Sequence, residues 1–252
     1  MKRSFSAPLM IICTVLLFSP VLARSDWIFD VEGGYAWPGY IDVRIPNDTG
    51  TSISLKDDIP AGSRAVYRLR LGYQFHPKHS VSFLFAPFGL NAQGTAEEDI
   101  SFNGDFFPAG TDLEAFYKFN SYRLTYRFDF LNTEKWTVGL GFTAKIRDAE
   151  VRLEGGGVRS SNTNVGFVPL LNFRVEWMFV DALSLLLDGD ALASPGGQGR
   201  AEDVSLALMY HLMDEKLSFK AGYRILEGGA DVESVYNFTL LHYAIAGAVL
   251  RF

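Results

Sequence analysis

The residues best suited to chemistry are charged side chains spaced two apart, which would share one face of an extended strand. Asp188 and Asp190 flank a glycine, and two such carboxylates could orient an attacking water. Hydrolysis of that kind also needs a base. Three of the four histidines fall near short turns. The fourth, His242, lies on the apolar face of its strand, opposite to the face that carries the charged residues. We therefore predict no catalytic residues.

The same spacing recurs along the chain and defines a larger charged set. It contains nine cations and six carboxylates: Asp30, Glu32, Arg68, Arg70, Arg123, Arg127, Asp129, Lys145, Arg147, Arg174, Glu176, Asp188, Asp190, Lys220 and Arg224. Two interpretations stay open. The set could form an interior ion-pair network, because unpaired buried charge is costly. It could instead line a narrow pore whose excess of cations favours anionic solutes. Neither interpretation requires a metal or a cofactor, and we predict none.

These charges lie in runs of period-two alternation, the pattern of strands with one apolar face. Tyr122 to Phe130 is an example, with apolar residues at even positions and Arg123, Thr125, Arg127 and Asp129 between them. A helix would need apolar spacings of three and four, which these runs lack. Ten runs follow this pattern, at roughly 26–38, 64–75, 80–90, 113–130, 136–152, 164–180, 182–192, 202–212, 216–226 and 236–252. The sequence therefore predicts an all-β protein.

The N-terminus has the form of a secretory signal peptide. Lys2 and Arg3 precede an apolar segment, and Val21-Leu22-Ala23 supplies the small-residue cleavage pattern. We predict a signal peptide over 1–23 and a mature domain over 24–252. The single cysteine, Cys13, lies in the removed part, so the mature domain has no disulfide. The formal charge of −6 argues against nucleic acid as a partner.

The connections between runs alternate in length. Tight turns alternate with long polar segments at 39–63, 91–112, 153–163, 193–201 and 227–235. Acidic residues make the long segments negative, namely Asp57, Asp58, Glu97, Glu98, Asp99, Glu202 and Asp203. Short turns at one end and long loops at the other are typical of transmembrane β-barrels. An even number of strands would place both chain ends on the short-turn side.

Aromatic residues distinguish a membrane barrel from a soluble sandwich. On the apolar faces, the short-turn ends hold Trp27, Tyr73, Phe75, Phe128, Phe130, Trp136, Trp177, Phe179 and Tyr210. The opposite ends hold Tyr35, Trp37, Tyr67, Phe116, Phe167 and Tyr223. Two aromatic belts separated by aliphatic residues are the girdles of a lipid-facing surface. We predict a single up-and-down antiparallel barrel of ten strands, with eight or twelve as the near alternatives.

The last strand, Tyr243 to Phe252, resembles the closing strand of bacterial outer-membrane β-barrel proteins, with alternating apolar residues and a terminal Phe252. In architecture the resemblance extends over the mature chain, and small barrels of the OmpA and OmpW type are the nearest. It implies export through the periplasm and a place in the outer membrane of a Gram-negative cell. It implies short periplasmic turns and long extracellular loops. It also implies that Phe252 is read by the barrel-assembly machinery.

The function expected from these features is that of a non-enzymatic barrel. It would be either a narrow, porin-like channel for small solutes or a structural and surface-interaction protein. A membrane-embedded hydrolase or lipid-modifying enzyme is the alternative from another class. The partners expected are outer-membrane lipid and lipopolysaccharide, and we expect a monomer.

Overall fold

The computed structural model describes residues 26–193 and 199–252, so the predicted signal peptide lies outside the described part. These residues form strands and their connections, and they contain no helix long and apolar enough to cross a membrane. The strands are β1 (Asp26–Arg44), β2 (Ile53–Ser54), β3 (Arg64–His76), β4 (His79–Ala86), β5 (Gly89–Thr95), β6 (Ile100–Phe102), β7 (Asp105–Phe107), β8 (Asp112–Asn132), β9 (Trp136–Gly155), β10 (Val158–Val180), β11 (Leu183–Ala193), β12 (Gly199–Leu212), β13 (Leu217–Val232) and β14 (Val235–Arg251).

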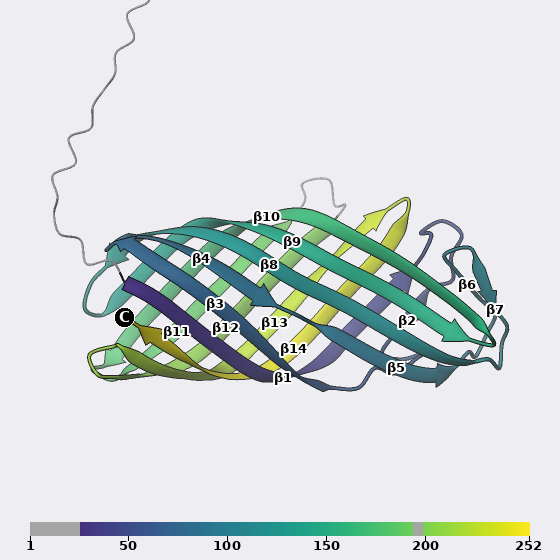
Figure 1. The fold of residues 1–252 in the computed structure, drawn as a ribbon, viewed down its shortest axis with the longest axis horizontal. Coiled ribbons are helices and arrows are strands. Elements are labelled where there is room, and N and C mark those ends of the chain that lie inside the picture. Colours follow the sequence, from purple (N-terminus) through teal and green to yellow (C-terminus); the bar gives the residue numbers. More distant parts are fainter. Residues whose placement is uncertain (1–25, 194–198) are drawn as a thin grey trace, which may run out of the picture.

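The long strands close into one antiparallel barrel (Figure 1). Each pairs with its neighbour in the chain, and β14 pairs with β1 from Ile28↔Arg251 to Arg44↔Tyr236. β4 and β5 are successive segments of one barrel strand, because both pair with β8. The barrel therefore has ten strands in up-and-down order, which confirms the predicted fold class and strand number. The chain ends meet at one end, where Trp27 and Phe252 exchange backbone hydrogen bonds of 2.8 and 3.0 Å.

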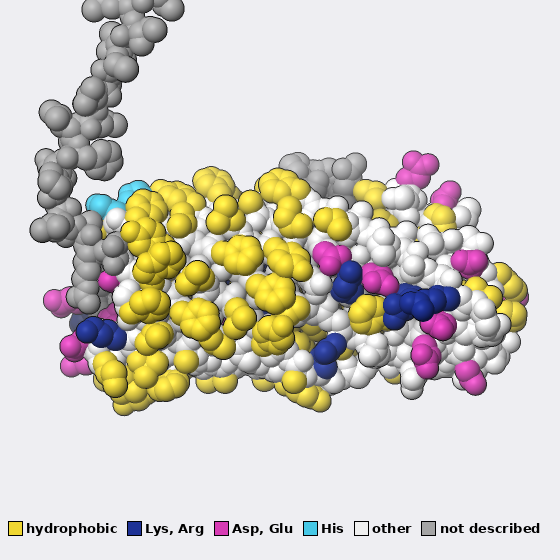
Figure 2. Space-filling view, viewed as in Figure 1, with side chains coloured by type: hydrophobic (Ala, Val, Ile, Leu, Met, Phe, Trp, Pro, Cys, Tyr) yellow, Lys and Arg dark blue, Asp and Glu magenta, His cyan; other side chains and the backbone are white. Residues whose placement is uncertain are grey.

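Apolar side chains cover the outside of the barrel over the half that contains the chain ends (Figure 2). On β9 this face is formed by Trp136, Leu140, Phe142 and Ile146, and Phe142 is 69% exposed. A continuous exposed apolar surface around a closed barrel is stable only against lipid. Charged side chains appear on the outer surface beyond this band. This arrangement supports the predicted parity of the strands and the two aromatic belts.

The polarity of the two faces is reversed beyond the band, although the strands continue. On β9 the outward positions after Ile146 are Asp148, Glu150, Arg152 and Glu154, while the inward Val151 and Leu153 are buried. Strand therefore continues through much of 153–163 and 227–235, which the sequence assigned to loops. The β9–β10 connection is reduced to Gly156 and Gly157, whose positive φ values of 58° and 82° suit glycine.

The inside of this outer half is a hydrophobic core. It is formed by inward residues of the barrel strands together with residues of the 45–63 and 96–111 segments, which fold into the barrel mouth. Among them, Phe102 and Phe107 of the β6–β7 hairpin and Leu153 and Leu241 of the wall are fully buried. The two longest connections therefore fill the mouth, as the core of a soluble protein would.

Candidate functional site

The interior of the membrane-spanning half is an ion-pair network centred on Asp203 of β12. Its carboxylate accepts from Arg68 at 2.9 Å, from Arg123 at 2.5 Å and from Arg224 at 2.5 Å. Arg68 and Arg123 come from β3 and β8, so their contacts cross the lumen, whereas Arg224 comes from the adjacent β13. Arg123 is only 1% exposed and also binds Asp190 of β11 at 2.8 Å.

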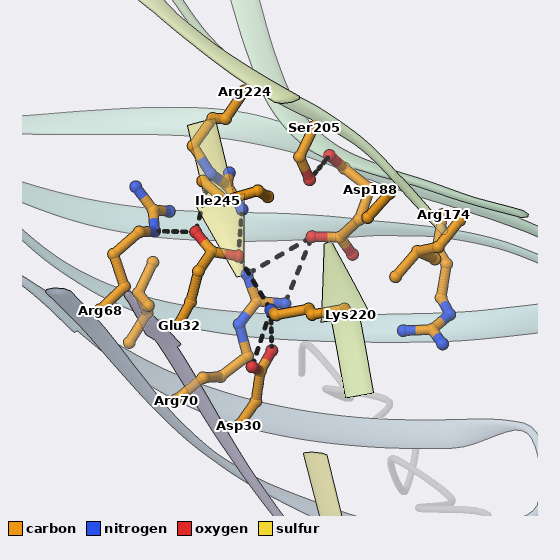
Figure 3. Close-up of a pocket in the computed structure, with 13 residues that line it drawn as sticks. Asp30, Glu32, Arg68, Arg70, Arg174, Asp188, Ser205, Lys220, Arg224 and Ile245 are labelled. Carbon is orange, nitrogen blue, oxygen red and sulfur yellow. Dashed lines mark hydrogen bonds and ion pairs between the residues drawn. The ribbon is translucent and has the colours of Figure 1, made fainter. Parts of the chain in front are cut away.

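A second part of the network surrounds Glu32 of β1 (Figure 3). Its carboxylate accepts from Arg224 Nε at 3.0 Å and Lys220 Nζ at 2.8 Å, and lies 3.5 Å from Arg68. Lys220 also binds Asp30 at 2.7 Å. The three cations stabilise the buried Glu32 carboxylate, which would strongly destabilise the folded state if it had no partner.

The network continues toward the periplasmic end. Arg70 and Arg127 approach Asp188 at 3.4 and 3.7 Å, and Arg127 Nε donates to Asp129 at 3.0 Å. Arg174 pairs with Glu176 two residues along β10, at 2.5 Å. Figure 3 shows Arg70 and Asp188 pointing toward one another across the interior. In this region, too, each cation has a carboxylate partner.

The complete network contains seven cations and seven carboxylates. It brings together thirteen of the fifteen residues selected from the sequence, and it adds Asp203. Assigning Asp203 to an acidic outer loop was wrong, because β12 begins at Gly199 and turns this side chain inward. Its spacing from Ser205, Ala207 and Met209 was the signal for an inward position. Lys145 and Arg147 have no ion pair with any described residue.

Two of the inward glycines, Gly139 and Gly166, accommodate these long side chains. A Cβ at Gly139 would collide with the Asp129 carboxylate and contact Arg127. At Gly166 it would lie 3.2 Å from Arg147 Nη2. At these two positions the glycines are complementary to the long charged side chains. Paired charges therefore occupy the interior of one half of the described barrel, and a hydrophobic core occupies the interior of the other.

A serine–histidine pair that the sequence analysis missed lies at the periplasmic end of the lumen. His211 Nε2 lies 2.8 Å from Ser184 Oγ, and His211 Nδ1 lies 2.9 Å from Ser218 Oγ. Ser184 also donates to Glu176 at 2.7 Å. In a catalytic triad the carboxylate would orient Nδ1, but here it shares the serine on the other ring nitrogen. Ser184 is also fully buried, so the arrangement is that of a structural hydrogen-bond chain.

The other candidates for chemistry lie outside any such arrangement. His242 faces outward and stacks on Trp37, with its Nδ1 hydrogen-bonded to Tyr223 Oη. Asp188 and Asp190 both have arginine partners, which suits ion pairing better than activation of water. Within 26–193 and 199–252, no three His, Cys, Asp or Glu side chains are placed to hold a metal ion.

The closed ten-stranded barrel and its lipid-facing band have the architecture of the bacterial outer-membrane β-barrels, in agreement with the predicted fold class. A scan against protein-family models and a search of curated proteins found no match.

Solved structures with this architecture do match. The outer-membrane protease OmpT of Escherichia coli is 11% identical, with a TM-score of 0.56 over 90% of this chain and 97% of that one. The translocator domain of the autotransporter NalP of Neisseria meningitidis is 14% identical, with a TM-score of 0.44 over 90% and 88%. The attachment invasion locus protein Ail of Yersinia pestis is 12% identical, with a TM-score of 0.41 over 90% and 99%. At these identities the likeness to OmpT shows a shared fold and nothing of activity.

Proposed function

We propose that this protein is a non-enzymatic, non-conducting outer-membrane barrel that acts through its outer surface. The observation that carries the proposal is the occupied interior. A layer of paired charges fills the membrane-spanning half, and a hydrophobic core fills the half above it. Ions could pass only if buried ion pairs separated and the inward-folded segments left the mouth. The same occupancy argues against the channel interpretation.

The outer part of the molecule has the properties of a preformed interaction surface. Its strands extend beyond the lipid-facing band, and its longest connections are held by buried side chains such as Leu55, Ile59 and Phe107. Hydrogen bonds add to this order, with Asn103 Nδ2 donating to Ser161 O at 3.1 Å and Asn47 Nδ2 to Asp231 at 2.7 Å. A preformed surface loses little conformational entropy on binding a partner.

The partners that we propose follow from the same surfaces. The apolar band would contact outer-membrane lipid, and the charged surface beyond it would contact lipopolysaccharide. During biogenesis the barrel-assembly machinery would read the terminal strand, where the Phe252 side chain is 66% exposed. We propose that the barrel is a monomer, because its lipid-facing band continues around the wall.

Planar-bilayer recording of refolded protein tests the proposal. Heat-modifiable migration on a semi-native gel would verify folding, and a general porin would serve as the positive control. We expect no conductance steps. Anion-selective steps that weaken in Arg123→Ala or Arg174→Ala would establish the channel instead. Lipid or peptide turnover lost in Ser184→Ala, His242→Ala or Asp188→Ala would establish an enzyme.

A further inference from the structure

Two interior cations stand apart from the ion-pair network. Lys145 and Arg147 lie two residues apart on the inward face of β9, beside Arg123 and Ser121 of β8. The predicted set has three more cations than carboxylates, and the added Asp203 balances one of them. The remaining positive excess is located in these two side chains. They also stand at the level where the interior changes from ionic to apolar.

Lys145 is deeply buried, with 3% of its surface exposed. Its ammonium lies 4.8 Å from the centre of the Phe119 ring, and it makes no hydrogen bond or ion pair with the residues of 26–193 and 199–252. Burying an ammonium without a counter-ion is among the costliest arrangements in a protein.

Arg147 is also only partly satisfied. One terminal nitrogen donates to Asn164 Oδ1, while the buried Nε has no partner in the described structure. A guanidinium with an unused N–H presents a planar set of donors, which matches the oxygens of a phosphate or carboxylate group. The neighbouring Lys145 adds a second positive charge on the same face.

A cavity of about 150 Å³ adjoins Arg147. This is far more than one water molecule needs. Asn162, Asn164, Asn237 and Tyr117 are its polar lining residues, and the rest of the lining is mainly apolar side chains, such as Ala149, and glycine. Lys145 does not line the cavity, although the ring that it contacts, Phe119, does. Glu150 also borders the cavity, but its carboxylate is paired with Arg152 and Lys118.

The cavity lies beside an incomplete part of the wall. The β10–β11 ladder begins at Leu171, and among the described residues the part of β10 from Val158 to Val168 has β9 as its only strand partner. Pro169 stands at the end of this ladder and has no N–H to extend it. Two residues that line the cavity, Asn162 and Asn164, lie on this part of β10.

We propose that Arg147 forms an oxyanion-binding site in the barrel mouth, which takes a phosphate group. Amide donors and the Tyr117 hydroxyl would complete the set around its oxygens. The group could come from inorganic phosphate or from the phosphate of lipopolysaccharide, since both present the same chemistry. This inference goes beyond the proposed function and does not depend on a closed lumen. Ion conductance in a planar bilayer would therefore contradict the proposed function but not the anion site.

The test compares phosphate binding by the wild type and Arg147→Gln, with Arg159→Gln as a charge-matched control. Arg159 lies on β10 with its side chain 64% exposed, away from the cavity. Refolded proteins in detergent would be titrated by calorimetry with inorganic phosphate and, separately, with lipopolysaccharide. Thermal unfolding would report stabilisation by binding. We expect Arg147→Gln to weaken binding about 10- to 100-fold, as for loss of a charge-assisted hydrogen bond.

Each outcome is decisive. Loss of inorganic phosphate binding in Arg147→Gln alone supports the site with a free anion. Loss of lipopolysaccharide binding alone, with no response to inorganic phosphate in any protein, supports the site with a lipid phosphate. An equal response of all three proteins to both probes, or no response at all, overturns the proposal. Ala149→Phe, which fills the cavity and keeps both cations, must also lose binding, and it carries the test if Arg147→Gln does not fold.

Discussion

The two halves of the barrel interior share the same strands, but their inward side chains have opposite polarity. In the membrane-spanning half, charged side chains face inward and pair with one another, while apolar side chains face lipid. In the outer half, apolar side chains face inward around the folded-in connections, while charged side chains face out. The direction of the side chains does not change along β9. What changes is the medium outside, from lipid to water.

The comparison shows that the surrounding solvent determines which face of a strand is apolar. A wall in lipid can place polar groups only in the interior, where each must find a partner. A wall in water can place them outside and use hydrophobic burial to hold the interior together. The boundary on β9 lies between Ile146 and Asp148, where the outward face becomes charged.

The largest effect is expected from breaking the ionic half at Arg123. Arg123→Ala would leave Asp190 without its arginine partner and remove one of three arginines from Asp203. We expect a loss of about 3–5 kcal/mol in the free energy of unfolding, measured by denaturant titration. The double variant Arg123→Ala with Asp190→Asn should recover part of this loss. A loss below 1 kcal/mol would show that the buried ions are hydrated.

A loss of about 2–5 kcal/mol is expected in the apolar half from Leu153→Ala, since this side chain is fully buried in the outer core. The outward neighbour change Arg152→Ala serves as the control and should have a small effect. If both variants unfolded like the wild type, the outer half would not be packed as a soluble core.

The reversal of polarity is tested directly by introducing the same charge at two outward positions of β9. Leu140→Arg places a cation in the lipid-facing band and should cost about 2–4 kcal/mol on refolding into bilayers. Glu154→Arg, beyond the band, should change stability by about 0.5 kcal/mol or less. Equal effects at both positions would contradict the assigned membrane boundary.

The smallest effect is expected at a polar cluster beyond the outer aromatic belt. Glu227 accepts from Arg200 and Tyr40, and the Arg200 hydrogen bond holds the pKa of Glu227 below its ordinary value. A lowered pKa in the folded state means that the stabilisation is present above the ordinary pKa of 4.5 and is lost as the pH falls below it. Thermal unfolding should separate the wild type from Glu227→Gln by about 1 kcal/mol or less at neutral pH.

That difference should disappear in acid as Glu227 is protonated. In alkali, partial burial and the bond to Glu227 raise the pKa of Tyr40 to about 12, so its hydroxyl remains a donor across the ordinary range. A difference between wild type and Glu227→Gln that stayed constant from pH 7 to pH 3 would contradict the role given to the carboxylate.

The membrane-spanning part of the fold could be predicted from the sequence because lipid enforces strict alternation over whole strands. Ten runs and two aromatic belts sufficed for the architecture. The outer ends of the strands were not found, because polar, glycine-containing segments such as 153–163 were assigned to loops. A reversal of polarity without a change of parity is easily mistaken for the end of a strand.

The candidate site could be predicted in composition but not in its pairing. Alternation selected inward charges strand by strand, yet Asp203 binds arginines of β3 and β8, far from β12 in barrel order. Such contacts depend on how long side chains meet across the lumen, which no spacing along the chain encodes. The same limit concealed the Ser184–His211 pair and the isolation of Lys145 and Arg147.

The pairing of Glu32 with Arg224 joins residues 192 positions apart, so the order of events in folding is constrained. Until β13 and β14 reach β1, Glu32 has only Arg68 of the adjacent β3 as a partner, and the ends of the sheet are unpaired. The entropy of bringing distant segments together is lost before their contacts form. The interior charges are therefore neutralised at the same stage of folding at which the barrel wall closes. A chain lacking its last strand would keep an unpaired strand edge, and part of its interior charge would have no counter-ion.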